Sequence, residues 1–118
     1  LLRSALYRQT EAVFESADLL LTPCLGALPL RVTHLATDPI EINGRNAGPL
    51  RSAWYNYPAP FNLTGHPALS IPAGRTPDGL PVGMQAVAPW YDEQRLVDLA
   101  AAIELLQPWE VTPAIKEE

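Results

Sequence analysis

The chain has 118 residues, 47% of them hydrophobic and 18% charged, with a formal net charge of −5. Its eight basic residues are scattered singly, which argues against a nucleic-acid partner or an anionic membrane surface. A single cysteine excludes an internal disulfide and a multi-cysteine zinc site, and no apolar run approaches the ~20 residues that span a bilayer. Leu1–Ser4 lacks the basic start and the cleavage site of a signal peptide. We therefore expect one cytoplasmic globular unit over residues 1–118, cut from a longer protein.

Two elements are predicted at the start of the chain. Residues 3–17 form an amphipathic helix, because apolar residues recur there at helical spacing. No capping residue precedes this helix, so we interpret its start as truncated. Residues 19–22 are a short apolar run closed by Pro23, a pattern typical of a strand that is buried on both faces.

Residues 24–49 form the longest segment without a periodic pattern, and glycine and proline interrupt it repeatedly. A connection of this length in a compact domain is usually a functional loop, a lid or a disordered segment. Within it, residues 40–44 predict a small hairpin arm that ends in an Asn-Gly turn.

Residues 50–63 are rich in aromatic side chains. Residues 50–57 have helical character, but Pro58 and Pro60 must end or kink that helix, because proline lacks the N–H and restricts the residue before it. The segment offers walls for an apolar substrate pocket, with asparagines as polar handles. The competing interpretation, packing in a core or an interface, is the commoner role of aromatic side chains. The candidate substrate-binding residues are Trp54, Tyr55, Tyr57, Phe61 and Asn62, with Asn56 as a second polar handle.

The clearest local pattern is a hairpin followed by a helix. Residues 68–73 and 82–88 are nearly all apolar and flank a Pro-Asp-Gly turn, which predicts two strands buried on both faces. Residues 92–106 carry an apolar stripe at helical spacing, with Asp92 as the candidate N-cap. Two helices are too few to cover both faces of a sheet whose strands are apolar on both sides. The sheet is therefore interpreted as the edge of a larger one.

The residues present do not supply a catalytic apparatus or a metal site. Cys24 could form a thiolate pair with His34 or His66, but a lone cysteine is usually an inert, semi-buried residue. Ser70 lies in a predicted strand without the Gly-flanked turn that exposes a serine nucleophile. The only lysine, Lys116, is near the end of the chain, so no Ser–Lys dyad is expected. The two histidines lack a metal-binding spacing, and His66 is most simply a turn residue.

Three blocks of the sequence together resemble the amidase signature hydrolases. Residues 60–74 (P-F-N-L-T-G-H-P-A-L-S-I-P-A-G) and residues 78–85 (D-G-L-P-V-G-M-Q), with a helix after them, resemble a late segment of these enzymes. Residues 17–23 resemble the strand that precedes the family's Pro-rich loop. The blocks keep the family's order and approximate spacing over nearly the whole chain, and this combination is specific.

The resemblance implies an α/β fold. The chain would be the C-terminal part of a mixed-sheet α/β/α amidase-type domain, with about three strands, including one hairpin, and two main helices. The family hydrolyses carboxamide C–N bonds through a Ser–cis-Ser–Lys triad without a metal or organic cofactor. Neither the Gly/Ser-rich nucleophile stretch nor the lysine upstream of it is matched here. We therefore expect a fragment that contributes sheet and substrate-pocket walls, is inactive alone, and either self-associates or is completed by the missing N-terminal part.

By the same resemblance, residues 54–61 and the loop of residues 24–49 would set the preference for an amide substrate. Glutamine-using members carry an acidic residue near the position of Tyr55, which favours an apolar or aromatic acyl group here. Two other classes stay open. A stand-alone binding module would hold an apolar ligand or partner with its aromatic segment, and a regulatory or assembly subunit would need a partner chain that completes the sheet.

Overall fold

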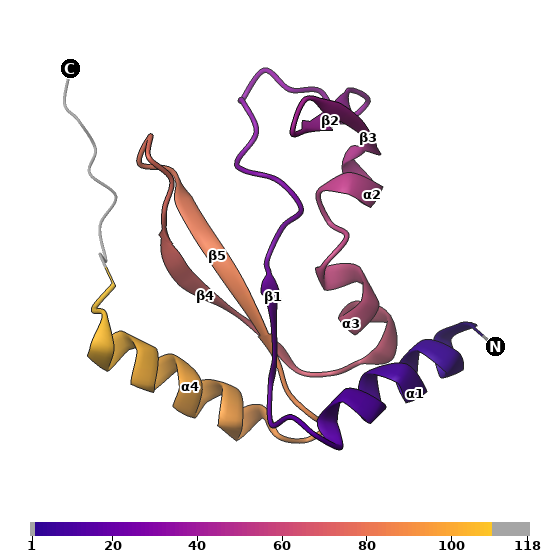
Figure 1. The fold of residues 1–118 in the computed structure, drawn as a ribbon, viewed down its shortest axis with the longest axis vertical. Helices are drawn as coiled ribbons and strands as arrows, with labels where there is room; N and C mark the ends of the chain where they lie inside the picture. Colours follow the sequence, from indigo (N-terminus) through magenta and orange to yellow (C-terminus); the bar gives the residue numbers. More distant parts are fainter. Residues whose placement is uncertain (1, 110–118) are drawn as a thin grey trace.

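The computed structural model describes residues 2–109, which form four helices and two antiparallel sheets (Figure 1). The elements are α1 (Leu2–Phe14), β1 (Leu20–Pro23), β2 (Pro39–Ile42), β3 (Arg45–Pro49), α2 (Leu50–Ala53), α3 (Pro58–Thr64), β4 (Ala68–Arg75), β5 (Pro81–Val87) and α4 (Glu93–Leu106). The predicted α/β character and the three-stranded sheet are confirmed for this part of the chain. The two long helices, α1 and α4, match the two main helices that were predicted. α2, with 4 residues, lies within the stretch 50–57 that was expected to have helical character, and α3, with 7 residues, is an addition.

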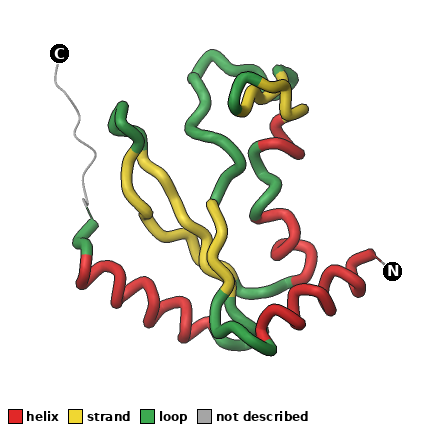
Figure 2. Tube along the Cα trace, in the orientation of Figure 1, coloured by secondary structure: helices red, strands yellow, loops and turns green. Residues whose placement is uncertain are grey.

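The molecule is open and flat. Its principal extents are 50 × 38 × 19 Å and its Cα radius of gyration is 16.5 Å, whereas a compact domain of this length has a radius of about 13–14 Å. The long helices leave the lower end of the sheet in opposite directions, and the loop after β1 rises to a separate upper arm (Figure 2). Large parts of the described elements therefore have no covering layer.

The three-stranded sheet has the order β1–β5–β4, with β5 in the centre. Leu20 of β1 and Ala68 of β4 both pair with Val87. The predicted hairpin turn is confirmed: the Thr76 N–H donates to the Leu80 carbonyl over 2.8 Å, and Gly79 has a φ of 83°, which glycine adopts without strain.

The core lies on the face of this sheet that meets α4, where Ile71, Ala86, Ala88 and Leu96 are buried together. The expectation that the hairpin is buried on both faces is wrong for β4, where exposed residues alternate with partly or fully buried ones. The reason is that the opposite face of the sheet, which does not meet α4, is covered only near Gln85. There the buried Gln85 side chain donates to the Thr22 hydroxyl over 3.0 Å and to the Tyr57 carbonyl over 3.3 Å.

The predicted hairpin arm is confirmed as β2 and β3, here called the arm. Asn43 and Gly44 have φ values of 52° and 73°, and two successive residues with positive φ are what an Asn-Gly hairpin turn requires. The predicted helix of residues 50–57 is shorter than expected, because α2 ends at Ala53. Pro58 starts α3 instead of only ending α2, since a proline in the first turn of a helix has no N–H to leave unpaired.

The start of α4 differs in detail from the prediction. Asp92 precedes the helix but makes no side-chain capping bond. Its carboxylate accepts a hydrogen bond of 2.6 Å from Arg95 Nε, and Arg95 Nη1 donates to Asp18 over 2.6 Å. These two hydrogen bonds, Asp92 first, raise the pKa of Arg95. The arginine thus ties α4 to the segment that leads into β1. Among residues 2–109, no helix has both the length and the apolar character needed to cross a membrane.

Candidate functional site

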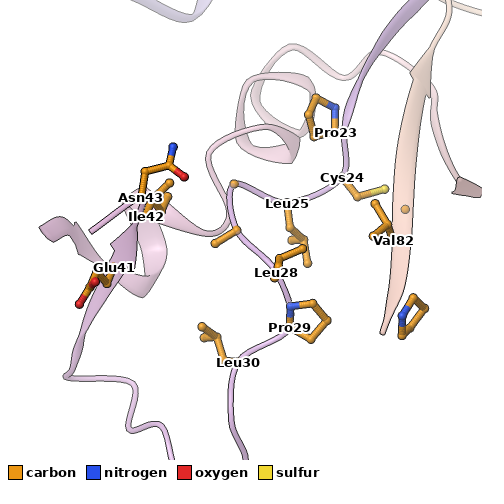
Figure 3. A pocket seen from close by; sticks show the side chains of 14 residues that line it. Pro23, Cys24, Leu25, Leu28, Pro29, Leu30, Glu41, Ile42, Asn43 and Val82 are labelled. Carbon is orange, nitrogen blue, oxygen red and sulfur yellow. The ribbon is translucent and has the colours of Figure 1, made fainter. Parts of the chain in front are cut away.

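A cavity of about 560 Å³ lies between the loop after β1, the turn of the arm and the start of β5. We call it the loop pocket. Figure 3 shows Leu25, Leu28 and Leu30 from the loop on one side and Val82 of β5 facing them. The lining residues are Pro23, Cys24, Leu25, Gly26, Ala27, Leu28, Pro29, Leu30, Glu41, Ile42, Asn43, Pro81, Val82 and Gly83. Apolar side chains therefore dominate this wall.

Backbone contacts hold the loop wall of this pocket in place. The Cys24 N–H donates to the Gly83 carbonyl over 3.1 Å, which continues the pairing of β1 with β5 by one residue. Two residues on, the Gly26 N–H donates to the Trp54 carbonyl over 2.9 Å. The Trp54 indole N–H in turn donates to the Ala27 carbonyl over 3.1 Å. The loop is thus held from Cys24 to Ala27, by β5 at Cys24 and by Trp54 at Gly26 and Ala27.

Gly26 is required by this close approach. A Cβ atom at this position would lie 2.1 Å from the Ala53 carbonyl oxygen and 2.6 Å from Asn56 Oδ1. Real Cβ atoms essentially never come within 3.0 Å of another heavy atom, so any side chain here must displace the loop from α2. Glycine at this position allows the loop wall and the aromatic segment to pack backbone against backbone.

The Cys24 thiol and the Ser70 hydroxyl are brought together between the loop pocket and a second hollow. Cys24 Sγ lies 3.0 Å from Ser70 Oγ, within hydrogen-bond distance, and either atom can be the donor. The second hollow has a volume of about 860 Å³, and Arg75 and Trp109 also line it. The Trp109 indole N–H is buried there without a hydrogen-bond partner among the described residues.

This thiol–hydroxyl pair does not form a nucleophile with its base. Activation of a serine or a cysteine needs a proton acceptor beside it, and the partner of Cys24 is a hydroxyl. Both ring nitrogens of His66 are bonded to other residues, and His34 Nε2 has no partner among residues 2–109. The considered pairing of Cys24 with a histidine is therefore not formed. Lys116 lies outside the described residues.

The five candidate substrate-binding residues lie in the segment between α2 and α3 and in α3 itself. None of them lines the loop pocket. Trp54 supports its wall from behind, Phe61 is buried at 8% exposure, and Tyr55, Tyr57 and Asn62 are exposed. Their role in substrate binding stays a prediction. The nearest structural support for the alternative role is Phe61, which packs as a core residue.

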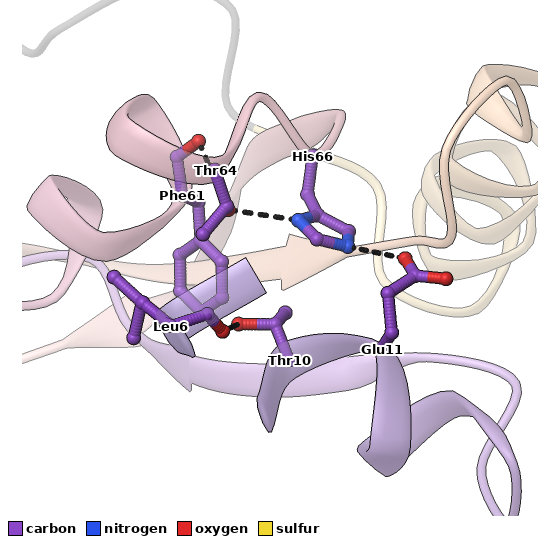
Figure 4. Close-up of polar contacts among 6 residues, drawn as sticks. All are labelled: Leu6, Thr10, Glu11, Phe61, Thr64 and His66. Carbon is purple, nitrogen blue, oxygen red and sulfur yellow. Dashed lines mark hydrogen bonds and ion pairs between the residues drawn. The ribbon is translucent and has the colours of Figure 1, made fainter. Parts of the chain in front are cut away.

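The most elaborate polar contact of the described chain was missed by the sequence reasoning. His66, expected only as a turn residue, is 5% exposed and accepts or donates hydrogen bonds at both ring nitrogens (Figure 4). Nδ1 lies 2.8 Å from Thr64 Oγ1, and Nε2 lies 2.8 Å from Glu11 Oε1. Nε2–H can donate to the Glu11 carboxylate, whereas the Thr64 hydroxyl also donates to the Phe61 carbonyl over 3.5 Å, so the direction of its contact with Nδ1 depends on the tautomer.

Aromatic rings surround this imidazole. Tyr7 and Phe14 of α1 lie 5.5 and 5.6 Å from it between ring centroids, and Trp90 lies 6.2 Å away. Burial, followed by the nearby Glu11 carboxylate, raises the pKa of Tyr7. We call Tyr7, Glu11, Thr64, His66 and Trp90 the base cluster, a label that does not mean a catalytic proton acceptor. These residues join α1, the end of α3 with the turn after it, and the loop before α4. A signal existed in the sequence only as helical spacing, since Tyr7, Glu11 and Phe14 are three or four residues apart.

No group of three or more potential metal-ligating side chains occurs within residues 2–109. The neutral polar side chains around the two cavities include the Cys24 thiol, the Ser70 hydroxyl and the Asn43 amide, which can form hydrogen bonds with a ligand, and Glu41 and Arg75 add one charge of each sign.

Comparison with known proteins identifies the family. The family profile described as Amidase matches residues 1–97. AmiC of Mycobacterium leprae, a putative amidase by name, is 35% identical over 105 residues, covering 88% of this chain and 21% of that protein. A glutamyl-tRNA(Gln) amidotransferase component from Salinibacter ruber is 35% identical over 103 residues, covering 86% of this chain and 18% of that protein.

Two solved structures are similar as well. A bacterial aryl acylamidase of the amidase signature family superposes with a TM-score of 0.78 at 34% identity, covering 92% of this chain and 22% of that one. A 6-aminohexanoate cyclic dimer hydrolase superposes with a TM-score of 0.69 at 30% identity, covering 87% and 22%. The chain thus spans about a fifth of the length of the relatives that it matches. With the profile match over most of its length, the chain belongs to the amidase signature family.

Proposed function

We propose that this chain is the C-terminal part of an amidase that hydrolyses carboxamide C–N bonds, and that it supplies sheet and pocket walls rather than the nucleophile. The observation that supports this most directly is the combination of family membership with a thiol–hydroxyl pair that has no proton acceptor beside it among the described residues. The open shape agrees with it, because a sheet covered at one face and at one end needs a further layer. The resemblance to the family supports a position of the nucleophile and its lysine upstream of the segment matched here.

We infer that the substrate of the complete enzyme carries an apolar or aromatic acyl group. Tyr55 stands near the position where glutamine-using members carry an acid, and its ring is 44% exposed. An exposed aromatic ring on the same segment as Tyr57 and Asn62 fits a pocket wall with a polar handle.

The proposal is tested by activity with and without the missing part. The 118-residue chain alone should not release product from acetanilide or benzamide, because an activated serine needs a base beside it, and within residues 2–109 the partner of Ser70 is a thiol. Adding a separately produced N-terminal part, taken from the reading frame upstream or from the aryl acylamidase, should restore turnover. Turnover by the purified chain alone that is lost on Ser70→Ala or Cys24→Ala would contradict the proposal.

A second measurement tests how the uncovered sheet behaves. Without its complement, the chain should self-associate through its exposed strands and apolar side chains, such as Leu21 at 51% exposure and Val82 at 37%. Light scattering over a concentration series measures this. A compact monomer at high concentration would favour the alternative, a stand-alone binding module, and a start codon directly before Leu1 would do the same.

The binding-module alternative has one specific observation in its favour. Backbone bonds within the described residues hold the pocket wall from Cys24 to Gly26, and the Trp54 indole N–H holds Ala27. The two functions are compatible.

A further inference from the structure

Three polar residues stand in one row across the three-stranded sheet. Gln85 in the central strand β5 pairs with Thr22 of β1 on one side and with Ser70 of β4 on the other. Residues paired in this way present their side chains on the same face of a sheet. The next residue of β5, Ala86, is buried in the core with Leu96 of α4, so the polar row lies on the opposite face. Gln85 is the buried member of this row, at 7% exposure.

The partners of the Gln85 amide determine the direction of both its hydrogen bonds. Its Nε2 lies 3.0 Å from Thr22 Oγ1 and 3.3 Å from the carbonyl oxygen of Tyr57. A carbonyl oxygen can only accept, so the NH₂ end of the amide, with its two protons, faces Tyr57. The Thr22 hydroxyl donates its own proton to the Pro23 carbonyl over 3.0 Å, so it accepts from Gln85. The arrangement therefore uses two donated protons at position 85, which an amide supplies and a carboxylate or a thioether does not.

The bond to Tyr57 attaches the start of α3 to the sheet. Tyr57 is the N-cap residue of α3, and α3 itself packs chiefly on α1. At the other end of the connecting segment, Trp54 bonds to the loop after β1. Tyr55 lies between these two attachments, and Asn62 lies in the helix that begins at the second one. Without the Gln85 amide, the start of α3 would lose this hydrogen bond to β5.

We propose that Gln85 is a positioning residue, whose amide fixes the start of α3 on the sheet and thereby sets the place of Tyr55, Tyr57 and Asn62 for the acyl group of the substrate. The effect on the substrate rests on the proposed function, in which these three residues belong to a pocket wall. Gln85 acts through the Tyr57 carbonyl and not by touching the substrate, because its side chain is buried and both amide protons are used within the chain.

The first test uses the unmodified chain and needs no activity. The Nε2 protons of Gln85 should exchange with solvent at least about tenfold more slowly than those of Gln94, because they are buried and bonded to two other segments. Gln94 is the matched control, since its amide donates to Asp98 on the exposed surface of α4. NMR with ¹⁵N-labelled glutamine measures both rates. Equal rates would overturn the proposal.

Two variants at position 85 and one at position 22 separate positioning from packing. Gln85→Met keeps the length of the side chain but donates no hydrogen bond, and Gln85→Glu places a carboxylate against the Tyr57 carbonyl. Thr22→Val removes the other partner of Gln85 and leaves the bond to Tyr57 in place. Both Gln85 variants should shift the carbonyl ¹³C resonance of Tyr57, and Thr22→Val should not. An unchanged resonance in a folded Gln85 variant would refute the proposal, and so would an equal shift in Thr22→Val. If neither Gln85 variant folds, the amide exchange of the unmodified chain decides.

The second test uses the enzyme reconstituted with its N-terminal part. Gln85→Met should raise the KM for benzamide about fivefold, the effect of one ordinary hydrogen bond, and should change kcat by less than about twofold. The same variant should leave the KM for acetamide unchanged, because a methyl group is too small to depend on an aromatic wall. Thr22→Val should leave both KM values unchanged. A purely structural loss would act on both amides alike, so an equal rise in the two KM values would contradict the positioning role.

The positioning role and the proposed function fail in different ways. If the unmodified reconstituted enzyme hydrolyses neither amide, the proposed function is overturned, and amide exchange with the Tyr57 carbonyl resonance still decides whether Gln85 holds the start of α3. If that enzyme is active but its Gln85→Met variant keeps the KM for benzamide, the positioning role is overturned and the amidase function stands.

Discussion

The base cluster and the loop pocket are stabilised in opposite ways. In the base cluster, a buried imidazole makes two side-chain hydrogen bonds of 2.8 Å and lies among aromatic rings. At the loop pocket, backbone hydrogen bonds hold the wall, while apolar side chains such as Leu28, at 56% exposure, stay uncovered. In the base cluster, the hydrogen bonds of the buried side chains are formed within this chain. At the loop pocket, apolar side chains stay exposed.

This difference distinguishes the contacts that the chain forms internally from the apolar surface that it leaves exposed. A side-chain network that buries a histidine must be satisfied within the folded chain, because an unpaired buried polar group is costly. Exposed leucine and valine carry no such requirement until something binds them. We therefore expect the amide hydrogens around the base cluster to exchange more slowly than those of the arm and the loop.

The largest expected effect is the loss of the buried imidazole. His66→Ala should lower the free energy of unfolding by about 2–4 kcal/mol, since it opens a cavity and removes the partner of Glu11 and Thr64. Urea denaturation followed by tryptophan fluorescence measures this. His34→Ala is the matched control: His34 Nε2 has no partner within the described part of the chain, and the change should cost less than about 0.5 kcal/mol. Equal losses in the two variants would show that the base cluster does not stabilise the fold.

A smaller effect is expected at the loop wall. Gly26→Ala should cost about 1–3 kcal/mol, because the added methyl group would lie 2.1 Å from the Ala53 carbonyl oxygen and the rigid backbone of α2 cannot yield cheaply. The same change should speed the alkylation of Cys24, as the wall moves outward. Urea denaturation and the rate with iodoacetamide are the two measurements.

Gly83→Ala is the comparison for this variant. Its Cβ would lie 3.0 Å from Cys24 Sγ, a side-chain atom that can rotate away, so the loss of stability should be smaller than at Gly26. A larger loss at Gly83 than at Gly26 would contradict the assignment of the loop wall to a backbone contact with α2.

The local elements of this fold could be predicted from the sequence because local chemistry determines them. Asn43–Gly44 and the Pro-Asp-Gly turn define two hairpins through the φ values that their residues adopt. The apolar stripe of α4 predicts the side on which the core lies. The role of Pro58 was misjudged, since a proline that ends one helix can equally begin the next.

The site could be predicted only in part, because it depends on contacts between distant segments. The 55 residues that separate Glu11 from His66, and the 46 that separate Cys24 from Ser70, leave no periodic trace. Gly26 had no local signal either, because its conformation is ordinary and only the approach of α2 requires the absence of a side chain. The spacing of residues did not indicate a role for the loop of residues 24–49, whereas the resemblance to the family implied that this loop sets the preference for an amide substrate, which stays a prediction.

The smallest expected effect concerns the ionisation of Tyr7 in the base cluster. Burial, and then the Glu11 carboxylate, raise its pKa above the ordinary value of 10.0. A raised pKa means that folding favours the protonated phenol, so its contribution to stability is complete below about pH 10 and is lost as the pH rises through the folded-state pKa. Unfolding in urea at several pH values between about 8 and 11 should therefore show a steeper alkaline loss of stability for the unmodified chain than for Tyr7→Phe. Tyr55→Phe provides the matched control, because Tyr55 is 44% exposed and is not among the groups that raise the pKa of Tyr7, and it should keep the steeper slope. Parallel pH profiles for the unmodified chain and Tyr7→Phe would mean that the phenol is not held against the carboxylate of α1. In that case the imidazole contacts alone would stabilise the base cluster, and the slower amide-hydrogen exchange expected there than at the loop would depend on His66.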